Sequence, residues 1–154
     1  MRDTEDAALW YSVQRFIVNY WAEVDLHGGG NAHGFYLADA VFAVGENRFE
    51  GQNKIRAFYA HRRRRGFSTT RHLISNLQVQ PLAEGEVRAI GVLCLYRADG
   101  RPPFQGERAP MLIADLTAEC VRVEEGWRFR SHLLHPLFVG GDIPYSISID
   151  PDAL

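Results

Sequence analysis

The chain has 154 residues and a formal net charge of −2 at pH 7, and 46% of its residues are hydrophobic and 12% aromatic. A chain of this length and composition can bury a core without disulfides or metals. We expect a single domain over residues 1–154, with residues 139–154 as a tail or lid. Because the charge gives no basic field to attract nucleic acid or anionic lipid, neither is expected as a partner.

The cysteines and the first residues of the chain indicate the cellular compartment in which we expect the protein. Cys94 and Cys120 lie in apolar runs without CxxC spacing, which favours buried free thiols. The first residues lack the apolar segment of a signal peptide, and the longest apolar run, residues 90–96, is too short to span a bilayer. We therefore expect a cytoplasmic protein without a membrane partner.

The first third of the chain predicts helices. Apolar residues recur at three- and four-residue spacing from Leu9 to Val24, so a first helix is expected with Thr4 as its N-cap and an end at Gly28. The segments that follow are expected to be a short helix, two strand-like runs and a third helix, at residues 31–37, 41–44, 48–50 and 52–65.

After residue 66 the apolar period changes to two, which predicts strands. Four strands with short connections are expected at residues 71–80, 86–98, 109–123 and 127–137. Short connections join antiparallel neighbours. Helices followed by an antiparallel meander make an α+β domain.

Alternation along the first of these strands predicts its two faces. It places His72 and Asn76 on one face and Leu73, Leu77 and Val79 on the other. The first face would line a pocket for a small-molecule ligand. Three helices cannot cover the second face as well, so we expect that face to form a homodimer interface.

Asp25 and His72 are the candidate catalytic residues. Asp25 lies at the margin of the apolar stripe of the first helix, and His72 lies on the first long strand. A carboxylate beside an imidazole fixes its tautomer and makes it a base near neutral pH. The alternatives are a solvated aspartate in the last helical turn and a core histidine bonded to a carbonyl group, and the separation of the two side chains decides between these interpretations.

Other polar residues are candidates for contact with a substrate. Asp115 is an ionisable group in an apolar strand row, although a pairing with Arg128 or Arg130 of the next strand would explain it equally well. The remaining candidates are groups that can bind an oxygen atom: Tyr20, Tyr36, Asn76 and His132. The histidines have no HxxxH spacing on a helix and no nearby cysteine, so neither a metal nor another cofactor is expected.

Four consecutive arginines, Arg62 to Arg65, end the third predicted helix. Cations at a helix C-terminus interact favourably with the helix dipole and are usually solvated. We therefore expect a solvated face rather than a nucleic-acid site.

The order of three helices, a strand pair ending in glycine and a long meander resembles the nuclear transport factor 2-like superfamily, also known as SnoaL-like or cystatin-like. The local matches are Val24–Asp25, Phe49–Ile55, Arg71–Asn76 and Gly126–Phe129. The resemblance implies a cone-shaped, curved antiparallel sheet packed on three N-terminal helices.

Within that superfamily, Asp25 and His72 match the proton-abstracting pair of scytalone dehydratase and hexachlorocyclohexane dehydrochlorinase, and Asn76 matches an asparagine four residues after the histidine. His132 stands where the dehydrochlorinase has an arginine, with Arg130 two residues earlier. The resemblance implies a cofactor-independent lyase or isomerase, of the dehydratase or cyclase type, that acts on a small, apolar, cyclic or polyketide-like molecule.

The fold also serves proteins without a catalytic role, such as the small subunit of ring-hydroxylating dioxygenases. A non-catalytic ligand-binding or assembly module is therefore the alternative. A monooxygenase-like or hydrolase-like variant is a third.

Overall fold

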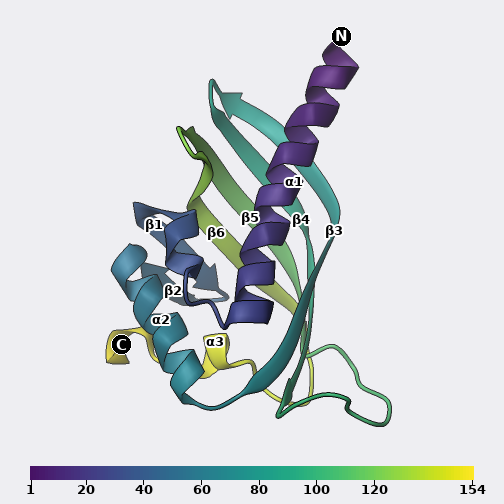
Figure 1. Cartoon of the computed structure of the whole chain (residues 1–154), viewed down its shortest axis with the longest axis vertical. Helices are drawn as coiled ribbons and strands as arrows, with labels where there is room; N and C mark the ends of the chain where they lie inside the picture. The colour runs from purple at the N-terminus through teal and green to yellow at the C-terminus, as the bar shows by residue number, and fades with distance from the viewer.

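The computed structural model describes all 154 residues as helices packed against one face of a curved six-stranded sheet (Figure 1). The helical elements in chain order are α1 (Arg2–His27), the 3₁₀ helix η1 (Ala32–Phe35), α2 (Gln52–Arg64), α3 (Tyr145–Ser148) and the 3₁₀ helix η2 (Pro151–Ala153). The strands are β1 (Tyr36–Val44), β2 (Asn47–Glu50), β3 (Ser68–Ala83), β4 (Glu86–Asp99), β5 (Leu112–Val123) and β6 (Gly126–Val139). The predicted α+β fold is confirmed.

The sheet has the order β2-β1-β6-β5-β4-β3. Strands β3 to β6 form the predicted antiparallel meander. The expectation of a wholly antiparallel sheet is wrong at one place, because β1 runs parallel to β6. This pairing joins segments about ninety residues apart, and no short connection in the sequence signals it.

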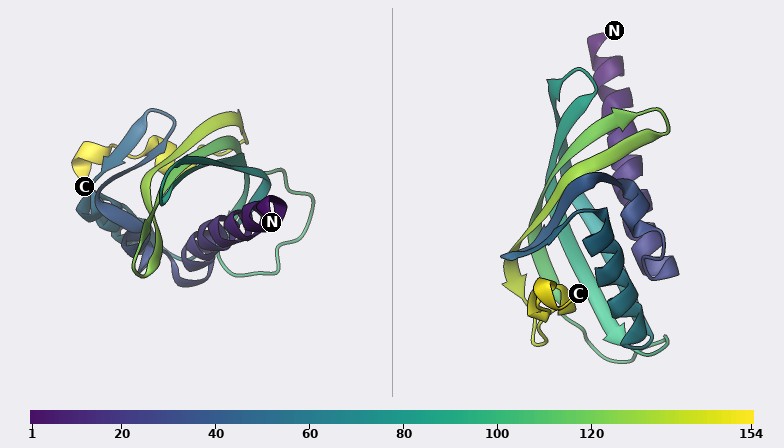
Figure 2. Two further views of the ribbon diagram at one scale, coloured as in Figure 1. Left: turned by 90° about the horizontal axis from the view of Figure 1, so that it is seen from above. Right: turned by 90° about the vertical axis from the view of Figure 1, so that its left-hand side faces the viewer.

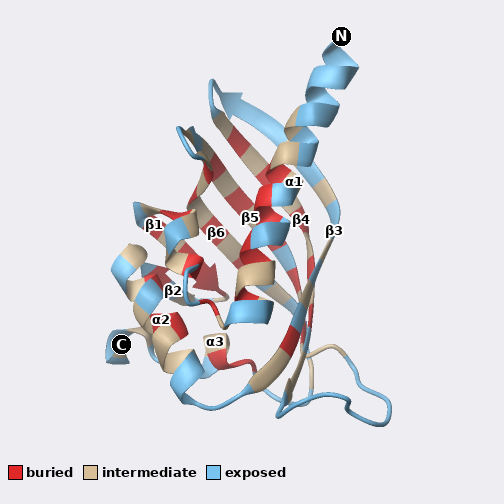
Figure 3. Ribbon diagram, viewed as in Figure 1, coloured by how far each residue is buried: buried red, intermediate tan, exposed pale blue.

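Helices α1 and α2 lie on the concave side of the sheet (Figure 2). The buried residues of α1 follow the predicted spacing, from Val13 through Ile17 and Tyr20 to Val24. The N-terminal turns of α1 extend past the sheet and are exposed (Figure 3). The helix begins at Arg2 rather than after Thr4, and no side chain caps it.

A bulge in β3 reverses the alternation of its side chains. Asn76 has a φ of 55°, and the pairing of β3 with β4 is irregular between Ser75 and Gln78. One extra residue in a strand moves the side chains beyond it to the opposite face. Leu77 packs against the core, whereas Leu73 is 51% exposed.

The prediction that Leu73, Leu77 and Val79 share the outer face is therefore wrong for the last two residues. Val79, like Leu77, packs against the core. Only Leu73, which precedes the bulge, remains on the outer face of the sheet.

The C-terminal residues fold back on the strand pair and α2. The Asn47 side chain donates to the carbonyl oxygens of Ser146, Ile147 and Ile149, each at 2.8 to 2.9 Å. The Lys54 ammonium donates to the carbonyl oxygens of two residues of the last turn, Pro151 and Leu154. These bonds fix the tail against β2 and α2.

No helix of the chain has the length and apolarity needed to cross a membrane.

Candidate functional site

Asp25 and His72 meet between the last turn of α1 and the start of β3. The His72 ring nitrogen Nδ1 lies 2.6 Å from Asp25 Oδ1, and the His72 backbone N–H donates to Asp25 Oδ2 at 2.8 Å. The two side chains are only 8% and 7% exposed. An ionised carboxylate accepts hydrogen bonds only, so Nδ1 carries the proton and Nε2 holds the free electron pair.

Thr70 completes the hydrogen bonds of the carboxylate. Its hydroxyl donates to Asp25 Oδ1 at 2.9 Å. Thr70 and His72 are two residues apart on β3 and therefore project from the same face. Asp25 thus receives three donors, which offset the unfavourable position of an anion at a helix C-terminus.

Trp21 fixes the plane of the imidazole. Its ring stacks on His72 with 4.1 Å between the ring centroids and an angle of 16°. Trp21 precedes Asp25 by four residues, so both project from one side of α1. The indole and the carboxylate together hold the histidine ring in one orientation, and the indole face also favours a protonated ring.

Burial lowers the pKa of His72 below its ordinary value of 6.5, and the nearby Arg62 lowers it further. The hydrogen bond and charge of Asp25 act in the opposite direction but do not reverse the shift. His72 is therefore neutral at pH 7, the form that accepts a proton.

His72 forms part of the wall of a narrow cavity between the helices and the sheet, in which the centre of a water molecule can occupy about 50 Å³. Twelve of the 18 lining residues are hydrophobic. The polar groups of the wall include Tyr59, Arg62, Thr70 and Arg97. A second, open hollow between α1 and β3 reaches the Asp25–His72 pair from outside.

The C-terminal tail supplies one side of the cavity. Tyr145 lines it, and its ring stacks on Phe58 at 5.4 Å between centroids. The Tyr145 hydroxyl is hydrogen bonded to His61, and the Arg65 guanidinium lies 4.1 Å from the centre of its ring. The tail is thus anchored to α2 beside the site.

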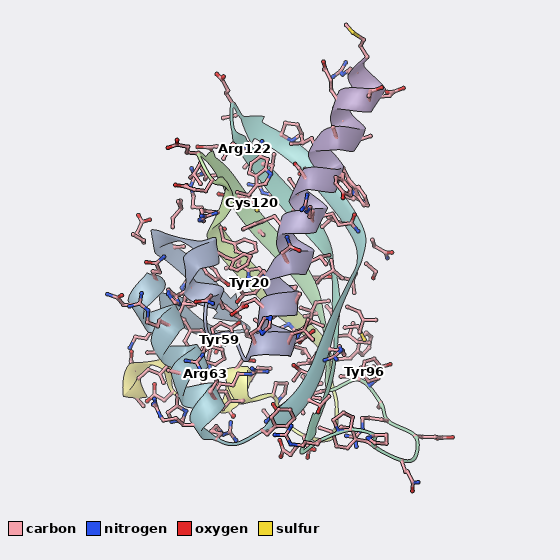
Figure 4. All side chains as sticks on the ribbon, in the orientation of Figure 1. Tyr20, Tyr59, Arg63, Tyr96, Cys120 and Arg122 are labelled. Carbon is pink, nitrogen blue, oxygen red and sulfur yellow. The ribbon has the colours of Figure 1, made fainter.

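Two predicted binding residues, Tyr20 and Tyr36, lie in a buried chain of hydrogen bonds. The Tyr20 and Tyr59 hydroxyls are 2.5 Å apart, between α1 and α2 (Figure 4). The Tyr36 hydroxyl donates to Tyr20 at 2.8 Å and lies 2.8 Å from His132 Nδ1. Because Tyr36 has already given its only proton to Tyr20, it accepts from Nδ1–H of His132.

His132 is fully buried, and its other nitrogen, Nε2, has no hydrogen-bond partner. Burial, assisted by the neighbouring His72, lowers the pKa of His132 to about 3. Tyr20, Tyr36 and His132 are not among the residues that line the cavity, although Tyr59 is. Their hydrogen-bonded chain therefore supports the cavity wall from behind.

The structure does not bring Asn76 and Asp115 to the cavity. Asn76 is exposed in the β3 bulge. Asp115 is exposed on the outer face of the sheet, opposite His135 of β6. Arg130 bonds Glu86 and Arg128 donates to the carbonyl oxygen of Trp127, so neither of the arginines considered as partners pairs with Asp115. Its neighbours Ala114 and Leu116 are the buried residues of β5, so Asp115 faces away from the core.

Several residues at the site were not predicted from the sequence: Trp21, Thr70, Arg62, Arg97 and Tyr145. Trp21 and Thr70 had a usable signal, because they precede Asp25 and His72 by one helical turn and one strand repeat. Arg62 also had one, since it follows Ile55 by seven residues and Tyr59 by three, which places it on the buried face of α2. The expected solvated face of the arginine run is wrong for Arg62, which is half-buried, whereas Arg63, Arg64 and Arg65 are exposed.

Comparison with known proteins agrees with this fold. The SnoaL-like domain matches residues 6–132. No curated protein sequence matches the chain.

Solved structures with the same fold are distant in sequence. One from Novosphingobium aromaticivorans, named "Putative Scytalone Dehydratase", has a TM-score of 0.77 at 17% identity and covers 95% of each chain. ActVI-ORFA from Streptomyces coelicolor has a TM-score of 0.71 at 15% identity and covers 87% of this chain and 98% of its own. A Catenulispora acidiphila protein in complex with S-DNPA has a TM-score of 0.69 at 17% identity, over 84% and 94% of the two chains.

At these identities the solved structures support the fold alone. The domain match covers residues 6–132, which is most of the chain. The chain therefore belongs to the SnoaL-like domain family.

Proposed function

We propose that the protein is a cofactor-independent lyase or isomerase, of the dehydratase or cyclase type, in which His72 removes a proton from a small cyclic substrate. The observation that carries the proposal is the 2.6 Å contact between His72 Nδ1 and Asp25 Oδ1 at the wall of a largely apolar cavity. Because Nδ1 faces Asp25, Nε2 is the nitrogen available to a substrate. Nε2 has the electron pair that a base requires.

The reaction begins at a carbon beside a carbonyl group. Nε2 takes the proton, and the electrons of the C–H bond form a C=C bond while the π electrons of the carbonyl group move onto its oxygen, which gives an enolate. The new imidazolium is stabilised by Asp25 and the Trp21 ring. In a dehydration the enolate re-forms the carbonyl group, the new C=C bond forms as the C–O bond of the β-hydroxyl group breaks, and that hydroxyl group takes the proton from the imidazolium and leaves as water. General base catalysis of this kind contributes about 10²–10⁴-fold.

The SnoaL-like family, a neighbour named for dehydration and a neighbour found with a small molecule support a role in small-molecule binding or conversion. The proton abstraction by His72 is argued from its contact with Asp25. Non-catalytic ligand binding is the alternative. It requires the same cavity but not a base, so a reaction that reports on the base alone separates the two.

Exchange of the C1 hydrogens of 2-tetralone for deuterium in D₂O is such a reaction, since it needs proton removal and no leaving group. We expect the protein to accelerate the exchange and both Asp25→Asn and His72→Gln to abolish the acceleration. Asp115→Asn is the matched control, because it makes the same change on the outer face of the sheet. This variant should catalyse the exchange at the parent rate. If Asp25→Asn keeps the parent rate, the proposed mechanism is wrong.

We also propose that the protein is a homodimer in a reducing compartment, the cytoplasm. Cys94 and Cys120 are free thiols. The outer face of β4 presents Ile90, Val92, Cys94 and Tyr96, the last 37% exposed, next to Leu73 of β3. This apolar row takes the place of the predicted interface of Leu73, Leu77 and Val79, of which the β3 bulge leaves only Leu73 on the outer face. A second copy of the sheet would cover the row.

A further inference from the structure

Two residues that line the cavity carry buried hydrogen-bond donors that no group of the protein satisfies. Four buried side-chain nitrogens of the chain lack a partner, and two of them, Trp21 Nε1 and Arg97 Nε, belong to residues that line the cavity. Both atoms are donors only. Acceptors on a bound molecule would satisfy such donors if these side chains turned toward it.

Arg97 is placed by the register of the sheet. It pairs with Thr70, the residue that donates to Asp25, and its side chain is 19% exposed. Its only ion pair uses Nη2 and Asp99, whose side chain is 85% exposed and therefore well hydrated. The Nε edge of the guanidinium is left without an acceptor.

Arg62 adds a second guanidinium from the opposite side. It lines the cavity from α2, is half-buried, and has no side-chain hydrogen bond or ion pair. The two arginines are close enough for the charge of Arg97 to lower the pKa of Arg62, in addition to the larger effect of burial. Asp25 is the nearby anion, but Thr70 and His72 already occupy its oxygens.

We propose that Arg62 and Arg97 form an anion subsite, and that the substrate carries a carboxylate group which this subsite binds. Two half-buried cations facing one cavity are stabilised by an anion with two oxygens, for which guanidinium groups have matching geometry. The apolar remainder of the wall accommodates the ring system of the same molecule.

The proposal rests on the proposed function and narrows its substrate class from an apolar cyclic molecule to a cyclic carboxylic acid. Arg97 is diagonal to His72 across the β3–β4 pair, a position at which residues are about 7–8 Å apart and their Cβ atoms somewhat closer. A carboxylate held by Arg97 thus leaves the reacting carbon, a few bonds away, within reach of the His72 base.

Binding of two probes to the whole protein tests the subsite. The probes are 2-naphthoate and 2-naphthamide, which have the same rings and differ in charge. We expect calorimetry at pH 7 to give about tenfold or tighter binding of the naphthoate, a preference that weakens in high salt. Arg97→Met and Arg62→Met should each bring the naphthoate close to the affinity of the amide.

Arg64→Met is the matched control, because Arg64 is exposed on the same helix, and it should bind as the parent does. Arg97→Lys keeps the charge and is the control for a folding defect in Arg97→Met. It should retain part of the preference for the naphthoate over the amide. Equal affinity for the two probes overturns the proposal, as does absence of naphthoate binding at millimolar concentration or parent-like binding by both methionine variants.

The outcome is separable from that of the catalytic test. Asp25→Asn should lose tetralone exchange but bind the naphthoate at least as tightly as the parent, because it removes an anion near the subsite. Failure of exchange with a retained naphthoate preference would contradict the lyase proposal alone. Normal exchange without that preference would contradict the subsite alone.

Discussion

Asp25 binds His72 twice, through the backbone N–H and through the ring, so the carboxylate fixes both the strand and the imidazole. The backbone bond ties the end of α1 to β3 whatever the protonation state of the ring. The ring bond determines which nitrogen faces the cavity. These two contacts separate the structural from the chemical role of Asp25.

The first prediction concerns the ring bond. Asp25→Asn removes a group that raises the pKa of His72, and burial and Arg62 then act alone. We expect the His72 pKa, measured by NMR titration of the imidazole, to fall below its value in the parent, with little change in melting temperature because the amide oxygen still accepts from the backbone.

Activity on a true substrate should fall by orders of magnitude in Asp25→Asn and in His72→Gln. The two losses should not add in the double variant, since the residues act as a unit. An unchanged His72 titration in Asp25→Asn would show that the two groups are uncoupled. Asp115→Asn should leave the titration as in the parent.

The second prediction concerns Thr70. Thr70→Val keeps the shape of the side chain but removes the donor to Asp25 Oδ1. We expect a loss of about 1 kcal/mol in the free energy of unfolding in urea, with a smaller fall in tetralone exchange than Asp25→Asn causes. Thr117→Val on the outer face of β5 is the control for strand propensity. If the Thr70→Val protein is as stable as this control, the hydrogen bond of the Thr70 hydroxyl does not stabilise the site.

The helices and the meander follow from the sequence because their signals are local. Apolar spacing in α1 and α2, and the turn residues between β3 and β6, determine these elements without knowledge of distant partners. Asp25 and His72 were recognisable by chemistry together with a family resemblance. Their contact depends on the packing of α1 against β3, which neither residue encodes alone.

The parts that were not predicted depend on register. Arg97 reaches the cavity because β4 pairs it with Thr70. Leu77 turns inward because Asn76 adopts a left-handed conformation and shifts the strand by one residue. Alternation alone assumes an unbroken strand, so one bulge exchanges the two faces of all that follows.

The third prediction concerns the outer face. Val92→Glu places a charge in the apolar row of β4 and should convert a dimer into a monomer in sedimentation at micromolar concentration. Leu82→Glu is the control, because Leu82 is 42% exposed at the end of β3, away from this row. A parent protein that sediments as a monomer would refute the dimer.

The last prediction uses the buried His132 to connect stability with pH. Its pKa is about 3 in the folded protein and about 6.5 in the unfolded chain, so between these values the unfolded chain binds one more proton. The stability that neutral His132 provides is therefore fully present above pH 6.5 and is lost as the pH falls toward 3. His72, whose pKa is also lowered, adds to the loss with the same sign.

His132→Asn should remove the contribution of His132 while its side-chain amide still donates to Tyr36. We expect the free energy of unfolding of the parent to fall more steeply than that of the variant, by about 1.4 kcal/mol per pH unit between pH 6 and 4. Urea unfolding at each pH measures both slopes, and the carboxylates common to both proteins cancel in the difference. Parallel slopes would mean that His132 takes up a proton without unfolding, and the hydrogen-bonded chain from Tyr59 to His132 would then not hold the ring neutral.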